Sequence, residues 1–244
     1  RLAPGVELSV GASMRRNRNA RDLDGIGSIE DRVAIGQTGR YGAGAYNVRV
    51  DFRPAHWLGL AAAVTRLDER RGFLGTRSLS DGDFGRGTQT DGVTVQADVD
   101  VTDGITLFGS ATGARSSSKD ASAAFRIAGS GVLGTSYQLG IAAAGVLGRD
   151  DRLRVSLSQP LTVERGTVDF TSVMVIDRET GEKGLVTQSF DVGGTARRAV
   201  AELRYGTPLL GGRAAMSLFG RSELRDVEAG TARVMVGSQA SLAF

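Results

Sequence analysis

Few residues in this chain are of the types that do chemistry, and they are scattered. There is one histidine, His56, and no cysteine. His56 stands close to Pro54 and Trp57 in a predicted turn, and no second histidine is available to act as a base. We therefore interpret it as a turn or interface residue. The lack of cysteine excludes disulfide bonds and thiolate metal sites.

One segment, Ser116-Ser-Ser-Lys119, matches the Ser-x-x-Lys pattern of penicillin-interacting enzymes. It lies in a predicted loop, however, and no Ser-Asp-Asn or Lys-Thr-Gly partner follows it. The chain also lacks a Gly-x-Ser-x-Gly motif, a phosphate-binding loop, a dinucleotide fingerprint and a cluster of histidine and carboxylate ligands. We expect no catalytic site, no metal and no cofactor.

The composition favours a β-protein that does not bind nucleic acid. Its 30 basic and 27 acidic residues interleave and leave a net charge of +3, so no basic face is expected. Glycine, at 35 residues against 4 prolines, suits tight turns and close strand packing. The longest apolar run, Leu139 to Leu147, is far too short for a spanning helix. A membrane would have to be crossed by strands.

Ten segments alternate with a period of two, which is typical of half-buried or barrel strands. Each is about nine to thirteen residues long, which is enough to cross a bilayer core when the strand is tilted. The predicted strands span 5–14, 42–53, 57–66, 92–102, 104–114, 135–147, 152–163, 198–207, 213–224 and 232–244.

The connections between these segments are alternately long and short. The short ones lie at 53–56, 102–104, 148–152 and 207–212, and the long ones at 15–41, 67–91, 115–134, 164–197 and 225–231. Up-and-down outer-membrane barrels alternate short periplasmic turns with longer extracellular loops in the same way. We therefore predict a single all-β domain over 1–244. It would be a closed antiparallel transmembrane β-barrel of the bacterial outer membrane, with both termini in the periplasm.

The stretch 164–197 leaves the number of strands open. Two alternating segments, 168–176 and 185–192, flank a natural turn at 177–184. They could pair as an extracellular hairpin above a ten-stranded barrel, or they could be two further spanning strands of a twelve-stranded one. Asp169 and Asp191 make them weak candidates for a lipid-facing strand, so we favour ten strands and a hairpin.

The polar side of the alternation carries charges of both signs. In a dry core such charges would each cost on the order of several kcal/mol unless paired, whereas a hydrated lumen keeps them wet or paired. On the competing interpretation they form the solvent face of a soluble β-sandwich. The predicted lumen charges are Glu7, Arg49, Asp51, Asp98, Asp100, Arg154, Glu202 and Arg204.

Small residues are expected either to make room in that lumen or to allow close strand packing. A barrel of about eight strands is just filled by its own side chains, so ten or twelve strands leave a narrow space. The small residues are Gly59, Ala61, Ala63, Gly109, Ala111 and Gly113, on the two adjacent rising strands 57–66 and 104–114, with the returning strand 92–102 between them.

The predicted strand ends carry two further signals. An alternating final strand that stops on phenylalanine resembles the closing strand of bacterial outer-membrane barrels, which the barrel-assembly machinery reads. Its apolar positions are Val234, Val236, Ala240, Leu242 and Phe244. Aromatic rings favour the membrane interface. A periplasmic girdle is therefore predicted at Phe52, Trp57, Tyr205 and Phe244.

A longer resemblance covers about 150–244. The segment Asp151-Arg-Leu-Arg-Val-Ser-Leu-Ser-Gln-Pro-Leu-Thr-Val-Glu-Arg-Gly166 precedes a hairpin loop and the acidic strand Ala199-Val-Ala-Glu-Leu-Arg-Tyr205. It resembles the C-terminal barrels of subtilisin-family serine-protease autotransporters of α-proteobacteria. The family barrels have twelve strands, and no subtilisin Asp/His/Ser set precedes Leu8. The first half of the chain shares only the pattern.

This resemblance implies a translocator of type V secretion, a non-enzymatic barrel that anchors an upstream passenger and lets it reach the cell surface. The implied partners are outer-membrane lipid and lipopolysaccharide, the barrel-assembly machinery and an N-terminal passenger. The alternative is a stand-alone small pore, or a surface-adhesion barrel that acts through its extracellular loops.

Overall fold

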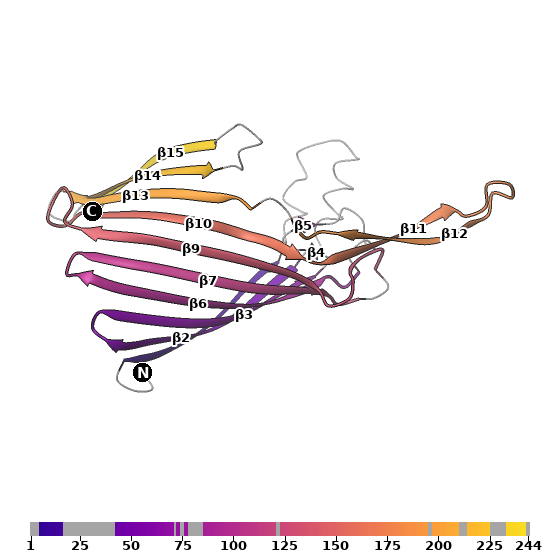
Figure 1. The fold of residues 1–244 in the computed structure, drawn as a ribbon, viewed down its shortest axis with the longest axis horizontal. Coiled ribbons are helices and arrows are strands. Elements are labelled where there is room, and N and C mark those ends of the chain that lie inside the picture. The colour runs from indigo at the N-terminus through magenta and orange to yellow at the C-terminus, as the bar shows by residue number, and fades with distance from the viewer. Residues whose placement is uncertain are drawn as a thin grey trace.

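Ten strands form one antiparallel sheet in which sequential strands are neighbours (Figure 1). The computed structural model describes residues 5–16, 42–70, 72–73, 76–77, 85–120, 123–194, 197–209, 214–224 and 233–242. The all-β class, the up-and-down order and the number of ten strands in this sheet are confirmed. Its strands are β1 (Val6–Arg16), β2 (Gly42–Ala55), β3 (Leu58–Arg70), β6 (Thr88–Thr102), β7 (Ile105–Ser118), β9 (Val132–Ala144), β10 (Arg152–Arg165), β13 (Ala199–Leu209), β14 (Ala214–Leu224) and β15 (Arg233–Leu242).

The short connections lie together at one end of the sheet, the short-turn end, where β1 also begins (Figure 1). Between β2 and β3 only residues 56–57 intervene, and between β6 and β7 only 103–104. The prediction that the strand starting near residue 135 continues to 147 is wrong. Gly145 has a left-handed backbone with a φ of 71°, and β9 ends just before it.

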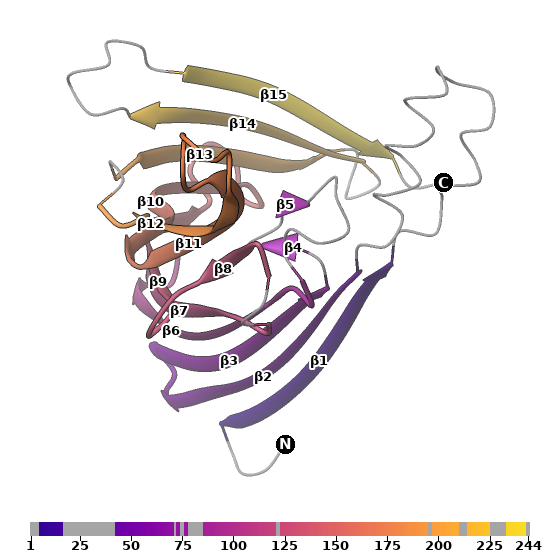
Figure 2. The same ribbon diagram turned by 90° about the vertical axis from the view of Figure 1, so that its right-hand side faces the viewer.

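The sheet is strongly curved but open (Figure 2). β1 and β15 are its two edges, and no hydrogen-bonded pairing joins them among the described residues. The described strands therefore do not form the closed barrel that we predicted. Alternation specifies the two faces of a strand, and a short turn specifies which sequence neighbours pair. Neither feature carries a signal for pairing between the first and the last strand.

Two small sheets lie at the end opposite the short turns (Figure 2). β11 (Thr167–Val175) and β12 (Lys183–Asp191) pair as a hairpin, and β8 (Phe125–Ile127) pairs with β11. The hairpin stands outside the ten-stranded sheet and projects beyond it (Figure 1), as the first of the two alternatives for 164–197 predicts. Its base packs in a small core formed by Ile127, Val132 and Val168. The other small sheet pairs β4 (Gly72–Phe73) with β5 (Thr76–Arg77).

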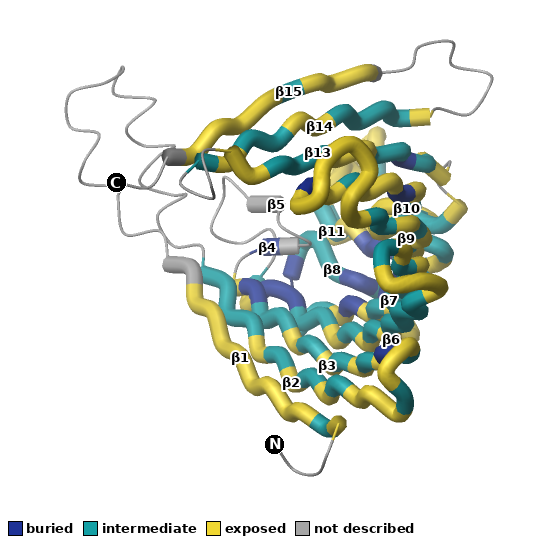
Figure 3. Tube along the Cα trace, turned by 90° about the vertical axis from the view of Figure 1, so that its left-hand side faces the viewer, coloured by how far each residue is buried: buried dark blue, intermediate teal, exposed yellow. Residues whose placement is uncertain are grey.

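The large sheet has one apolar face and one polar face. Directly paired residues of antiparallel strands lie on the same side of a sheet. Val64 is paired with Val48 and Val93, whereas the next residue, Thr65, is paired with Asn47. Figure 3 shows the resulting alternation of exposed and half-buried residues along β2 and β3. The apolar face exposes Val48, Val50, Val64, Val93, Val95, Leu107, Leu139, Leu157 and Leu203.

Three glycines on the polar face lie beneath a larger side chain of the neighbouring strand. A Cβ at any of them would collide with that side chain. Each pair is directly opposed in the register, so a slip by one residue would place the large group against a side chain instead. The pairs are Phe108 over Gly140, Phe219 over Gly237 and Asp98 over Gly59.

Replacing one of these glycines tests the register. Gly140→Ala is expected to destabilise the folded protein by about 1–3 kcal/mol, the usual cost of overpacking, because the added methyl meets the Phe108 ring and the Val155 carbonyl oxygen. The matched control is Gly113→Ala, since nothing lies within 4 Å of a Cβ there. Urea unfolding of the purified protein in detergent micelles compares the two. Equal unfolding midpoints would contradict this packing.

Candidate functional site

The polar face carries all eight of the charges that the sequence assigns to a lumen. The register places them on one side of the sheet, in two groups of opposite character. A mainly acidic group comprises Glu7, Arg49, Asp51, Asp98 and Asp100 on β1, β2 and β6, and a mainly basic group comprises Arg154, Glu202 and Arg204 on β10 and β13.

The guanidinium of Arg49, in the acidic group, donates hydrogen bonds to Asp51 and to Gln96. Arg49 donates from Nη2 to Asp51 Oδ1 at 2.6 Å and from Nε to Asp51 Oδ2 at 2.9 Å. Its Nη1 donates to Gln96 Oε1 at 3.0 Å. The bidentate pair fixes geometry. Both side chains are 38% exposed, so the ion pair itself adds little to stability.

Arg49 reaches Gln96 by crossing the strand between them. β3 separates β2 from β6, and on the polar face it presents Ala61 and Ala63 beside this pair. These two small residues leave room for the guanidinium on the polar face, and Gly59 leaves room for Asp98. Without them a long side chain on β3 would stand in the path of the guanidinium.

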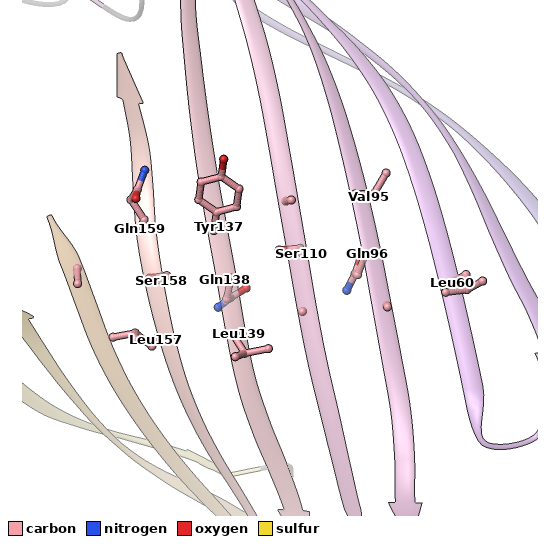
Figure 4. A pocket seen from close by; sticks show the side chains of 14 residues that line it. Leu60, Val95, Gln96, Ser110, Tyr137, Gln138, Leu139, Leu157, Ser158 and Gln159 are labelled. Carbon is pink, nitrogen blue, oxygen red and sulfur yellow. The ribbon is translucent and has the colours of Figure 1, made fainter. Parts of the chain in front are cut away.

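The other three small residues do not belong to that face. Gly109, Ala111 and Gly113 of β7 are directly paired with Ala97, Val95 and Val93, which places them on the apolar face. β6 lies between β3 and β7, as the chain order of the predicted strands implies. Gly109 and Ala111 instead help to form a hollow of about 710 Å³ in the apolar face, with Leu60 and Val95 to one side and Tyr137 and Leu139 to the other (Figure 4).

The basic group combines an aromatic contact with an ion pair. The Arg154 guanidinium carbon lies 4.0 Å from the centre of the Phe108 ring, within the range of a cation–π contact. Glu202 lies 3.6 Å from Arg221 of β14. Arg204 stands directly opposite Arg154 across β10 and β13. The two arginines are thus neighbours along the backbone pairing, and the Arg154 guanidinium extends toward Phe108 of β7, on the side of β10 away from β13.

The residues predicted for the interface and the terminal strand are partly described. Phe52 and Trp57 lie at the short-turn end and are 43% and 45% exposed. Val234, Val236 and Ala240 are exposed on β15, on its apolar side. The side chain of Leu242 and the whole of Phe244 lie outside the described residues.

Tyr205, the remaining predicted interface residue, contacts a carboxylate that the sequence did not single out. Asp151 is only 1% exposed. It accepts hydrogen bonds at 2.7 Å from the backbone N–H groups of Val146, Leu147 and Gly148, and at 3.0 Å from the Tyr205 hydroxyl. Burial opposes ionisation, but these donors outweigh it and lower the pKa of Asp151. Asp151 thereby fixes the turn between β9 and β10.

A second carboxylate secures the base of the hairpin. Asp169 of β11 accepts from the Ser189 hydroxyl at 2.7 Å and from Arg126 Nη2 at 2.9 Å. The Ser189 hydroxyl and the Arg126 guanidinium lower the pKa of Asp169. The bonds join β12 and β8 to the strand between them. Asp169 is only 7% exposed, so this network orients the hairpin and leaves no free group for chemistry.

The catalytic candidates occupy structural positions. His56 is exposed in the turn between β2 and β3. Ser116 is buried in β7, not in the predicted loop, and its hydroxyl lies 2.7 Å from that of Thr90. Lys119 Nζ pairs with Asp68 at 2.7 Å. The described residues include no group of three or more His, Cys, Asp and Glu placed to hold a metal ion.

No helix among the described residues is long and apolar enough to cross a membrane. No known family, no curated protein and no solved structure matches the chain.

The Asp151 turn generates a pH-dependent prediction. Because the folded pKa lies below the ordinary 3.8, the carboxylate stabilises the fold above that pH and loses its contribution as the pH falls through the folded pKa. Asp151→Asn is therefore expected to lower the thermal unfolding temperature at pH 6 by roughly 2–4 °C. Below pH 3.8 the difference from the unaltered protein should shrink.

Asp150→Asn is the matched control, since it removes the same charge from an exposed neighbouring residue. Thermal unfolding temperatures of both variants and of the unaltered protein are measured by circular dichroism from pH 7 to pH 3. The interpretation fails if Asp150→Asn and Asp151→Asn have the same pH profile.

Proposed function

We propose that β1 and β15 join in the membrane to close the ten-stranded sheet into an outer-membrane β-barrel, and that this barrel serves as the translocator and anchor of a passenger that precedes it. The observation that carries the proposal is the division of the sheet into an exposed apolar face and a charged face. A protein in water would have to cover the first, and a dry core could not accommodate the second. Lipid outside and a wet lumen inside satisfy both.

The edge strands support closure. Val10 on β1 and Val236 on β15 are 75% and 77% exposed, among the largest exposures of any apolar side chain described. An open edge also leaves backbone N–H and C=O groups unpaired, which bilayer hydrocarbon does not tolerate. Pairing β1 with β15 would cover both edges. With ten strands the pairing is antiparallel, since an even number reverses the direction.

The strands are long enough for such a barrel. The shortest, β15, has 10 residues, and the longest, β6, has 15. A tilted strand needs about nine to eleven residues to cross the hydrocarbon core. We place the short-turn end in the periplasm and the hairpin of β11 and β12 outside the cell, in keeping with the loop lengths of this class.

The translocator role rests on the sequence resemblance over 150–244 and on the course of the first strand. β1 starts at the short-turn end. A passenger attached before it would therefore begin in the periplasm and have to pass through the barrel to reach the surface. The charged lumen would offer that segment a hydrated path.

One observation favours a second candidate, a surface-adhesion barrel. The tip of the hairpin exposes Val173, Ile176 and Leu185 at 65%, 55% and 76%. Apolar side chains on a projecting element are typical of a binding surface. In this case the loops would carry the function and no passenger would be needed.

Barrel closure predicts which engineered cysteines can join. The chain has 0 cysteines, so any disulfide that forms must join the two introduced cysteines. Ser9 lies on the polar face of β1, and it should form a disulfide with a cysteine on the polar face of β15, at Met235, Gln239 or Ser241, because bridged Cβ atoms must lie about 4 Å apart. Leu8→Cys, which points to the apolar face, should not cross-link to the same positions.

Oxidised and reduced samples from outer-membrane fractions are compared on gels, and the folded form should migrate faster than the boiled form. Ser217→Cys with Gln239→Cys, directly paired in the sheet, is the positive control. If only this control forms, β1 and β15 do not meet and the barrel proposal falls.

The translocator role has a separate test. A reporter domain fused before Arg1 should become accessible to protease added to whole cells when the chain is present, and should stay protected when β13 to β15 are deleted. A folded, heat-modifiable barrel whose reporter remains in the periplasm would favour the adhesion barrel or pore.

A further inference from the structure

Three arginines, Arg152, Arg154 and Arg204, form a cluster on the polar face near the short-turn end. We refer to them as the arginine cluster. Arg154 and Arg204 are directly paired across β10 and β13, and Arg152 is two residues from Arg154 on the same side of β10. Direct pairs of like charges weaken a sheet because the two charges repel each other. The sheet therefore retains an unfavourable arrangement at this point.

Elsewhere on the same face the arginines are compensated. Arg49 is bound bidentately by Asp51, and Arg221 lies 3.6 Å from Glu202 and 3.7 Å from Glu223. No ion pair to Arg152, Arg154 or Arg204 occurs within the part of the chain that the structure describes. The four carboxylates of the acidic group (Glu7, Asp51, Asp98 and Asp100) belong to β1, β2 and β6. They lie on the other half of the sheet.

The arginine cluster lines a groove of about 810 Å³ that runs from β10 across β13 and β14 to β15. Uncharged polar side chains share the lining, among them Ser217 and Gln239, and the one acidic residue among the described lining residues is Asp150 of the adjoining turn. Hydroxyl and amide groups can donate hydrogen bonds to an anion alongside guanidiniums. The groove therefore combines positive charge, neutral donors and space.

One guanidinium of the cluster is held in place. Arg154 stacks 4.0 Å from the centre of the Phe108 ring, which in turn lies over Gly140. Stacking restricts the arginine while leaving its N–H edge free, so less entropy is lost when that edge binds. Such a residue is suited to planar, two-point recognition of an oxyanion.

We propose that the arginine cluster is a binding site for a small multivalent oxyanion of the inorganic phosphate and diphosphate class. The site rests on the proposed function only in requiring that the polar face be wet. Bound anion would relieve the repulsion between Arg154 and Arg204, and the guanidiniums would hold two of its oxygens each. Monovalent chloride would satisfy neither the charge nor the geometry.

Titration of the full chain, folded in detergent micelles, with inorganic pyrophosphate at constant ionic strength tests the site. Calorimetry should give saturable binding that chloride at the same ionic strength does not compete away. Arg204→Gln should weaken it about tenfold or more. In anion-free buffer the same variant should unfold at a higher temperature than the unaltered protein, because it removes the like-charge pair, and pyrophosphate should no longer raise that temperature.

Arg49→Gln is the matched control, since it removes the same charge from the same face at a guanidinium that Asp51 already occupies. Equal weakening by Arg49→Gln and Arg204→Gln would reduce the effect to general electrostatics and overturn the site. Arg204→Lys keeps the charge but not the two-point geometry, and should bind several-fold more weakly. Undiminished binding by this variant, or unsaturable binding by the unaltered protein, also overturns the proposal.

Failure of this site and failure of the barrel give different results. Heat-modifiable migration without saturable pyrophosphate binding leaves the barrel standing and removes the anion site. Pyrophosphate binding by a protein that shows no cross-link between β1 and β15 leaves the site and removes the closed barrel.

Discussion

The fold depends on one constraint: each strand must keep an apolar face and a charged face apart along its whole length. A slip by a single residue would exchange the two faces. The register is therefore fixed by more than backbone hydrogen bonds, which would tolerate a slip. Glycines opposite Phe108, Phe219 and Asp98 accept one large group each and accept it only in this register. Such pairs link β3 to β6, β7 to β9 and β14 to β15, so the alignment is set at separate points across the sheet.

The same constraint explains how much of the fold the sequence could predict. Every one of the ten strands was found from its alternation, because one face is apolar and the other is not. The errors concentrate at the end with the long connections, where β3 continues to Arg70 and β6 begins at Thr88. The directly paired segments there, 67–69 and 88–90, are rich in polar residues on both faces. Alternation is invisible where both faces are polar, although the backbone pairing continues.

Contacts between residues far apart in the chain could not be predicted from the sequence, because they depend on which strands pair. Asp151 and Tyr205 are neighbours only because β10 pairs with β13, and Asp169 meets Arg126 only because β8 joins β11. Neither pair has a spacing that a motif would record. The assignment of small residues failed on the same ground. Ala61 and Gly109 are alike as residues, and only the register across β6 shows that they lie on opposite faces.

Small residues thus have different effects on the two faces of the sheet. On the polar face Ala61 and Ala63 let Arg49 cross β3 and reach Gln96, so that a long side chain can bridge three strands. On the apolar face Gly109 and Ala111 leave a hollow beside Tyr137 that protein atoms do not fill. In the proposed barrel this hollow would face lipid, and flexible acyl chains could occupy it. In the proposed barrel this placement would suit a wet lumen on the polar side, where side chains bridge strands, and lipid on the apolar side, where the surface is uneven.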